Sequence, residues 1–185
     1  MKKIVLLGDS IRLIGYGETV ARELADAFTV WQPADNCRYA KYTMRGLYEW
    51  RNELENVDII HWNNGLWDLC TMVDNENFTP VELYVDEMVR LAGMLQKRAK
   101  TVIFATTTPV KPQNQNMCNG DIEAYNAAVL PRLAAMGIVI NDLHSAVKEN
   151  IDRYICDDLT HLSEEGITLC AGLVTEVIRR EADRL

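Results

Sequence analysis

Short apolar runs alternate along the chain with stretches whose apolar residues recur every three or four positions. The runs cover residues 3–7, 29–31, 57–63, 101–106 and 138–142. A continuous apolar run is typical of a strand buried on both faces, and the longer spacing is typical of a helix with one buried face. The alternation predicts a five-stranded parallel sheet with helices on both sides, which is a doubly wound, flavodoxin-like α/β/α fold.

The helical stretches begin after residue 15 and near residues 43, 80, 121 and 163. Thr43 is predicted to cap a helix over residues 43–54, and Pro80 fits the first turn of the long helix that follows it. No internal repeat, low-complexity segment or linker interrupts the pattern. Because 185 residues suit one hydrophobic core, we expect a single domain over residues 1–185.

The first apolar run stops at Gly8-Asp9-Ser10. Taken alone, such a tripeptide is most often a turn or a helix cap. In open α/β sheets, however, ligands and chemistry gather at the carboxyl ends of the strands. Ser10 is therefore a candidate nucleophile, provided that another part of the chain supplies a base.

The chain has three histidines, His61, His144 and His161, and only His161 follows an aspartate at Asp-x-x-His spacing. A carboxylate at that spacing can accept a hydrogen bond from Nδ1 of the imidazole and leave Nε2 free to take a proton from a serine. Asp158 has this spacing, and Asp157 competes with it for the orienting role. The sequence thus predicts a triad of Ser10, His161 and one of the two aspartates, Asp157 or Asp158, with His61 and His144 structural.

Charge and cysteine content narrow the functional classes. Twenty-seven acidic residues against 19 basic ones give a net charge of −8, which argues against nucleic acid or an anionic membrane as partner. The five cysteines form no C-x-x-C pair, so reduced thiols in a cytoplasmic protein are expected, without a metal or another cofactor.

The first apolar run is too short for a signal peptide, and no segment approaches the ~20 apolar residues of a membrane span. The sequence is compatible with a homo-oligomer as well as with a monomer.

The combination of Gly8-Asp9-Ser10, Asp158-x-x-His161 and an Asn-Gly-x-x-Asp stretch after the middle strand resembles the SGNH hydrolases, also called the GDSL esterase/lipase superfamily. The resemblance spans nearly the whole chain. It implies the three-layer fold, selects Asp158 over Asp157, and implies hydrolysis of short-chain acyl esters. Deacetylation of a carbohydrate is the leading substrate hypothesis.

The two middle blocks depart from the family pattern. Aligning the block after the second strand places Lys41 where a glycine usually helps to bind the oxyanion, and its backbone N–H could still serve. In the next block, Trp67 stands where an asparagine is usual. Asn63 and Asn64 are the substitutes, and the resemblance favours Asn63 as a donor to the oxyanion beside the N–H groups of Ser10 and Lys41. The alternative for Asn64-Gly65 is an ordinary turn.

Substrate contacts are expected from Tyr39, Asn64 and Trp67, and from apolar residues of the connection over residues 69–79. Two other functions stay open. One is a flavodoxin-like module that binds a phosphate or nucleotide, although the chain lacks G-x-G-x-x-G and a P-loop. The other is a catalytically weak or inactive SGNH-like domain that binds acylated carbohydrate or another small ligand.

Overall fold

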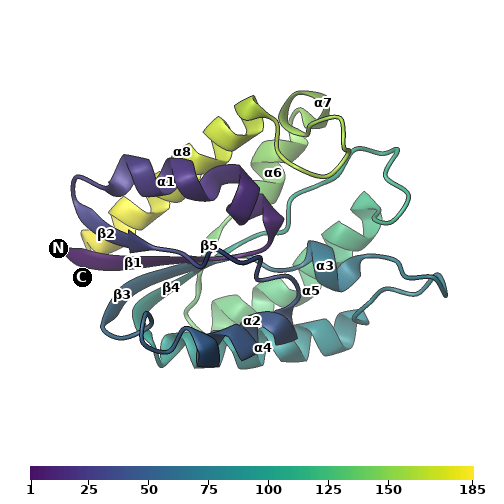
Figure 1. Ribbon diagram of the computed structural model, residues 1–185. Helices are drawn as coiled ribbons and strands as arrows, with labels where there is room; N and C mark the ends of the chain where they lie inside the picture. Colours follow the sequence, from purple (N-terminus) through teal and green to yellow (C-terminus); the bar gives the residue numbers. More distant parts are fainter.

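The computed structural model describes residues 1–185 and contains one five-stranded parallel sheet with the strand order β2-β1-β3-β4-β5 (Figure 1). The strands are β1 (Lys2–Leu7), β2 (Phe28–Trp31), β3 (Val57–Trp62), β4 (Ala99–Ala105) and β5 (Val139–Asn141). The strand β2 lies on one side of β1, and the later strands lie on the other side. The strand order therefore reverses beside β1. In open sheets of this kind, ligands bind at such a reversal.

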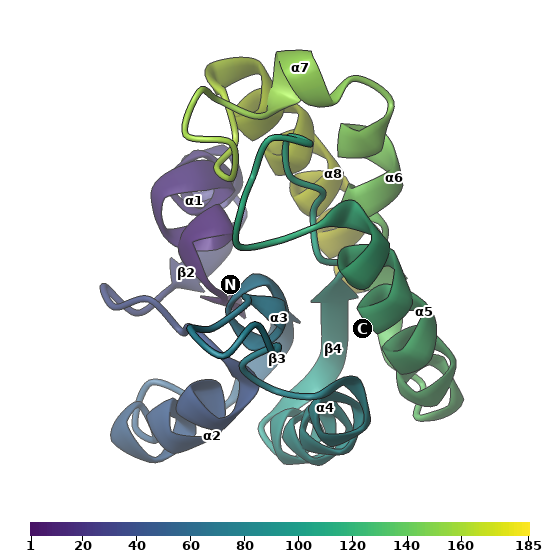
Figure 2. The same ribbon diagram turned by 90° about the vertical axis from the view of Figure 1, so that its right-hand side faces the viewer.

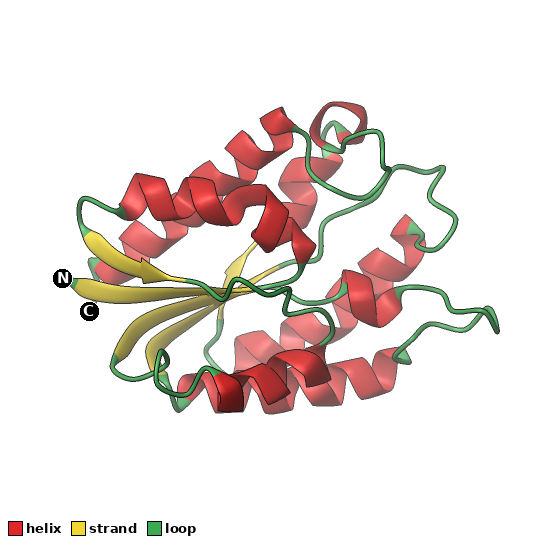
Figure 3. Ribbon diagram, in the orientation of Figure 1, coloured by secondary structure: helices red, strands yellow, loops and turns green.

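Helices cover both faces of the sheet, so the predicted three-layer fold is confirmed (Figure 3). One face carries α1 (Gly17–Leu24), α6 (Leu143–Lys148), α7 (Ile151–Tyr154) and α8 (Glu164–Ala182) (Figure 1). The other face carries α2 (Ala40–Glu49), α4 (Val81–Gln96) and α5 (Asn119–Ala135). Two short elements lie beyond the strand ends, namely the π-helix Ile11–Tyr16 and α3 (Leu66–Leu69).

The strands form the centre of a continuous cluster of 44 buried apolar residues. Ile4, Val5, Leu6 and Leu7 of β1 are each 0 % exposed, as expected of a strand covered on both faces. Each fully buried side chain of this size stabilises the fold by roughly 1.5–3 kcal/mol relative to an exposed one. None of the helices combines the length and the apolar character needed to cross a membrane.

The second helix differs from its prediction. It covers Ala40–Glu49, so Thr43 lies inside it and is not its cap. The Thr43 hydroxyl instead donates to the carbonyl of Cys37 at 2.8 Å. The N–H of Ala40 donates to both carboxylate oxygens of Asp68, at 3.2 Å each. A carboxylate from another segment therefore satisfies the helix start, and a local capping rule could not foresee this.

Gly65 connects β3 to α3 in a conformation that only glycine adopts easily, with φ of 154°. A Cβ at this position would lie 2.0 Å from Oγ1 of Thr107. Gly172, in contrast, lies in α8, and a Cβ added there would have no other atom within 4 Å. Backbone strain and steric overlap thus coincide at Gly65 and are both absent at Gly172.

We therefore expect Gly65→Ala to lower the free energy of unfolding by at least ~2 kcal/mol. Gly172→Ala should raise it by about 0.5–1 kcal/mol, because alanine restricts the unfolded chain and suits a helix. Urea unfolding followed by circular dichroism measures both values. Equal effects of the two substitutions would contradict this account of the β3–α3 turn.

Candidate active site

The carboxyl edge of the sheet brings three distant segments together (Figure 2). Ser10 follows β1, Asn63 follows β3, and the loop over residues 156–161 precedes α8. Adjacent parallel strands end at the same edge, which is why β1 and β3 place their following residues side by side. The loop before α8 reaches this edge because α8 packs against α1, on the same face of the sheet.

Ser10, His161 and Asp158 form a continuous chain of hydrogen bonds. Oγ of Ser10 lies 2.8 Å from Nε2 of His161, and Nδ1 of His161 lies 2.6 Å from Oδ2 of Asp158. Since an ionised carboxylate only accepts hydrogen bonds, Nδ1 carries the proton and Nε2 accepts from the serine hydroxyl. This tautomer leaves the imidazole ready to take the proton of Ser10.

The loop over residues 156–161 fixes Asp158 from two sides. Its Oδ1 accepts from the N–H groups of Thr160 at 2.9 Å and His161 at 2.8 Å. Burial acts to raise the pKa of Asp158, but these N–H donors outweigh it and hold the pKa well below its ordinary value. The carboxylate is therefore ionised at neutral pH. Leu159, with φ of 71°, makes the tight turn between these residues.

Asp157 points away from the imidazole. Its side chain is fully exposed and lies 3.3 Å from Nζ of Lys111. Of the two carboxylates that the sequence offered, the structure thus brings Asp158, and not Asp157, to His161. The N–H of Lys111 also donates to the carbonyl of Leu159 at 2.9 Å, which ties this loop to the segment after β4.

A cavity of about 260 Å³ opens beside the Ser10 hydroxyl, and apolar atoms make up most of its wall. It is lined by Ser10, Leu66, Trp67, Cys70, Met117, Thr160 and His161. Trp67, which the sequence analysis expects to contact substrate, lies at its wall with 42 % of its surface exposed. Leu66 and Thr160 were not predicted, because neither carries a chemical signal that distinguishes it in the sequence.

Asn63 lies next to the turn over residues 8–10, with its side-chain amide held at both ends. Its Oδ1 accepts from the hydroxyl of Tyr16 at 2.9 Å. Its Nδ2 donates to Oδ1 of Asp9 at 2.7 Å. The same Asp9 oxygen accepts from the N–H of Ile11 at 2.9 Å. Nδ2 has a second hydrogen, and no other group of the chain accepts from this atom.

Asn64 does not face the cavity, so the expectation that it contacts substrate is not supported. It is 1 % exposed, its Nδ2 donates to the carbonyl of Arg38 at 2.7 Å, and its Oδ1 accepts from Thr43 at 3.1 Å. Successive side chains at a strand end point to opposite sides, so Asn63 and Asn64 contact different segments. Asn64 fastens the β2–α2 loop to β3.

The loop between β2 and α2 has a left-handed residue at Arg38, with φ of 49°. The N–H of Arg38 donates to Oδ1 of Asn36 at 2.7 Å. Lys41 is helical, and its side chain extends to Glu87 at 2.8 Å. The backbone N–H of Lys41 belongs to the first turn of α2 and has no acceptor in the chain. The N–H of Lys41 thus stays free to donate, as the alignment by motif spacing requires of an oxyanion donor.

A buried arginine lies under the turn over residues 8–10 and was not singled out by sequence reasoning. Arg12 is 0 % exposed, and its guanidinium donates to the carbonyls of Gly8, Pro33 and Asp35 at 3.1, 2.9 and 2.8 Å. It thereby joins the end of β1 to the β2–α2 loop. Nε has no partner, and the remaining donors of this buried charge hold the two loops in a fixed relation.

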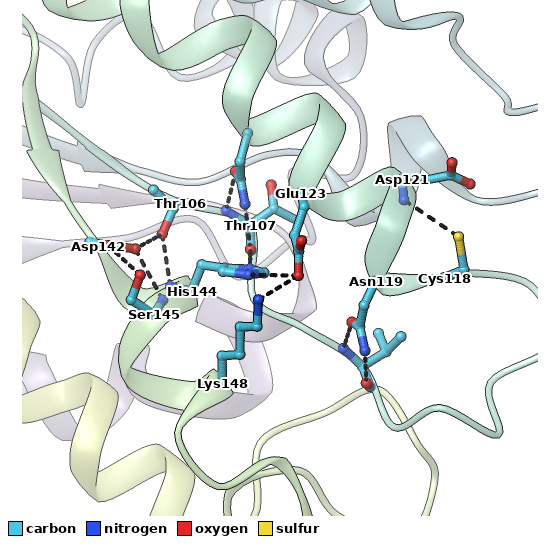
Figure 4. A network of polar contacts seen from close by, with 12 residues as sticks. Thr106, Thr107, Cys118, Asn119, Asp121, Glu123, Asp142, His144, Ser145 and Lys148 are labelled. Carbon is cyan, nitrogen blue, oxygen red and sulfur yellow. Dashed lines mark hydrogen bonds and ion pairs between the residues drawn. The ribbon is translucent and has the colours of Figure 1, made fainter.

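The segment after β4 is supported by a polar network around His144 (Figure 4). Nδ1 of His144 donates to the carbonyl of Thr107 at 2.9 Å, and its N–H donates to Oγ1 of Thr106 at 2.8 Å. Oγ1 of Thr107 in turn donates to the carbonyl of Asn64 at 3.2 Å. His144 thus supports the β3–α3 turn from behind and does not approach Ser10.

His61 is fully buried within β3, and burial lowers its pKa to about 3. Its Nε2 accepts from Nδ2 of Asn141 at 3.2 Å. His161 is therefore the one histidine that hydrogen-bonds to a serine hydroxyl in this structure. No group of three or more His, Cys, Asp or Glu side chains is arranged to hold a metal ion.

Several solved structures have the same fold as this chain. A lipase/acylhydrolase from Enterococcus faecalis superposes with a TM-score of 0.79 at 21 % identity, over 96 % of this chain and 95 % of that chain. An acetylxylan esterase from Geobacillus stearothermophilus gives 0.78 at 15 % identity, over 95 % and 93 %. A member of the lipolytic protein G-D-S-L family from Veillonella parvula gives 0.77 at 16 % identity, over 97 % and 100 %. The chain shares the fold of these proteins, as its resemblance to the SGNH hydrolases predicted.

No protein-family model and no curated protein matches the chain by sequence. At identities of 14–21 % the likeness concerns the fold. The chemistry of this chain depends on its own side chains.

Asp68 behind the cavity offers a test of the site's electrostatics. The carboxyl is 0 % exposed, and burial, with a smaller contribution from the nearby Glu87, raises its pKa to about 7. A folded-state pKa above the unfolded value means that the folded protein binds the proton more tightly. Asp68 therefore makes its most favourable contribution to stability at acidic pH, and this contribution is lost as the pH rises through about 7.

We subtract the free energy of unfolding of the parent from that of Asp68→Asn at each pH. This difference should be larger at pH 8 than at pH 5 by on the order of 1–3 kcal/mol. Asparagine keeps an oxygen for the N–H of Ala40 and does not ionise. Unfolding of both proteins in urea at several pH values measures the difference. Asp157→Asn, at an exposed position, is the control. If the variant instead became less stable relative to the parent as the pH rises, Asp68 would be stabilised in its ionised form.

Proposed function

We propose that the protein is a serine carboxylic ester hydrolase, with Ser10 as nucleophile, His161 as general base and Asp158 as the group that orients the imidazole. The observation that carries this proposal is the continuous hydrogen-bond chain from Ser10 through His161 to Asp158, at 2.8 and 2.6 Å. It opens onto a cavity at the edge of the sheet where ligands usually bind.

The reaction follows from this geometry. As Oγ of Ser10 attacks the ester carbonyl carbon, Nε2 of His161 takes the hydroxyl proton, and the ionised Asp158 stabilises the resulting imidazolium. The same proton then passes to the leaving alcohol, which departs and leaves an acyl-serine. Water, deprotonated by His161, attacks the acyl group and releases the acid and free Ser10.

The oxyanion of the tetrahedral intermediate needs donors, and three are proposed. They are the backbone N–H groups of Ser10 and Lys41 and the side-chain amide of Asn63. The two backbone groups have no acceptor in the chain, and Nδ2 of Asn63 keeps one hydrogen unused. One such donor usually contributes ~10²–10³ to the rate.

The cavity favours a short acyl group. Its volume of about 260 Å³ is below the roughly 300–1,000 Å³ of pockets that hold drug-sized ligands. Leu66, Cys70 and Met117 give it an apolar wall suited to a methyl group or a short alkyl chain. The acetylxylan esterase from Geobacillus stearothermophilus, which has the same fold, acts on an acetylated carbohydrate by its name.

An aromatic surface next to the cavity supports a carbohydrate as the alcohol part of the ester. The Arg38 guanidinium lies 5.9 Å from the Trp67 ring and 4.7 Å from the Tyr42 ring. The Tyr39 ring lies 6.0 Å from that of Tyr42 and 4.9 Å from that of Phe78. Aromatic faces can stack against sugar rings, and the guanidinium can donate to hydroxyl groups.

Ser10→Ala should lower ester hydrolysis by ~10⁴–10⁶-fold while the melting temperature stays near that of the parent. Hydrolysis of 4-nitrophenyl acetate and labelling by a fluorophosphonate probe measure the loss. The control is Ser145→Ala, because Ser145 also lies beside a histidine and near an aspartate but donates to Asp142 at 2.6 Å. A labelled, active Ser10→Ala protein would remove Ser10 from the mechanism, and an unlabelled, inactive parent would favour a non-catalytic binding domain.

Phe78→Ala tests the substrate class. It is expected to lower kcat/KM for acetylated xylo-oligosaccharides by about 2–12-fold, mainly through KM, because one stacking surface is lost. Its kcat/KM for ethyl acetate should not change, since Phe78 does not line the cavity. Tyr48→Ala removes a similarly exposed ring on α2 and is the control. An equal loss on both esters, or on neither, would contradict a carbohydrate at this surface.

A further inference from the structure

The mechanism proposed above gives no role to the buried side chain of Tyr16. It lies at the end of the π-helix Ile11–Tyr16, six residues after Ser10, and is 0 % exposed. Its hydroxyl does not donate to the backbone but to Oδ1 of Asn63, at 2.9 Å. The segment that presents the nucleophile therefore also contacts the side chain proposed to bind the oxyanion.

The partners of Asn63 leave its amide one orientation. Oδ1 accepts a hydrogen bond from the Tyr16 hydroxyl, and Nδ2 donates to the Asp9 carboxylate at 2.7 Å. If the amide turned by 180°, Oδ1 would face the carboxylate, and two acceptors would repel each other. With the amide fixed, the second hydrogen of Nδ2 has one direction only, and no group of the chain takes it up.

Tyr16 is itself fixed by packing. Its ring meets the His61 ring edge-on, with centroids 5.7 Å apart and an interplanar angle of 90°. Burial raises the pKa of Tyr16 well above its ordinary value, so the hydroxyl remains a donor throughout the working pH range. A donor that neither ionises nor moves is what an amide needs if it is to be pre-oriented before the charge develops.

We propose that Tyr16 is a positioning residue for ester hydrolysis: its hydroxyl holds the Asn63 amide so that Nδ2 donates to the oxyanion formed at Ser10. This inference rests on the proposed function and on Asn63 as an oxyanion donor. Tyr16 does not touch the substrate and acts only through Asn63. A hydrogen bond to Oδ1 also polarises the amide and strengthens its N–H as a donor.

The test is a double-mutant cycle with 4-nitrophenyl acetate as substrate. Asn63→Ala should lower kcat by ~10²–10³-fold with KM nearly unchanged, because the contact forms in the transition state. Tyr16→Phe should lower kcat by roughly 10–100-fold, again at constant KM, since Asn63 stays but is no longer held. The double variant should match Asn63→Ala, because the hydroxyl has nothing left to orient.

A purely structural role of Tyr16 gives a different result. Tyr16→Phe would then lower the melting temperature and would reduce kcat by the same factor whether or not Asn63 is present, which would overturn the proposal. Tyr125→Phe is the matched control, because its hydroxyl is also buried but donates to the carbonyl of Thr79 at 2.6 Å. It should change stability without changing kcat.

Two further measurements keep the test decisive. The cycle is run at 15 °C, near the usual temperature of maximum stability, with the folded fraction of each variant taken from circular dichroism. Labelling rates with a fluorophosphonate, whose phosphonyl oxygen also needs the oxyanion donors, give a second readout that requires only one turnover. These rates should show the same loss in Tyr16→Phe, and the same absence of a further loss when Asn63 is alanine.

The outcomes separate this inference from the proposed function. A parent protein that neither hydrolyses the ester nor reacts with the probe overturns the esterase proposal, and this inference with it. An active parent whose Asn63→Ala variant keeps its kcat leaves the esterase in place and overturns the role of Tyr16. An active parent with a costly Asn63→Ala and a Tyr16→Phe of unchanged kcat also overturns this inference alone.

Discussion

The hydrogen bond between Ser10 and His161 joins residues 151 positions apart, and the positions of both depend on how the sheet is ordered. The serine follows a central strand whose neighbours fix it on both sides. The histidine lies on a loop between two helices of the same face. A 2.8 Å contact between them requires the whole layer of α1, α7 and α8 to be in place. The site can therefore form only in the fully folded protein.

Buried polar groups keep this edge of the sheet rigid. Arg12 connects the turn over residues 8–10 to the β2–α2 loop through backbone carbonyls, and Asn64 connects that loop to β3. Burial raises the pKa of Asp9 to about 6, while its hydrogen bonds from Asn63 and Ile11 and the charges of Arg12 and His161 act to lower it. Groups that are costly to bury are tolerated where their partners are fixed, and such networks pre-organise a site.

Buried polar contacts also hold the two middle blocks that depart from the SGNH pattern. The usual oxyanion asparagine position holds Trp67, which instead forms a wall of the cavity and the start of an aromatic surface. A side-chain amide is available from Asn63, two residues before Gly65. The glycine turn is closed by Thr107, which His144 and the β4 segment support from behind. The proposed donor Asn63 thus lies two residues before a glycine turn that Thr107 and His144 hold in place.

The sequence by itself determined the alternation of strands and helices, because periodicity reports directly which faces are buried. It also determined Ser10 and the Asp158-x-x-His161 pair as candidates, since a strand end and a three-residue spacing are local features. Only the tertiary structure decided the remaining polar contacts. Thr43 does not cap its helix because Asp68 arrives from another segment. The partner of Tyr16 lies 47 positions away. Hydrogen bonds between distant segments depend on how elements pack, and no short sequence pattern records that packing.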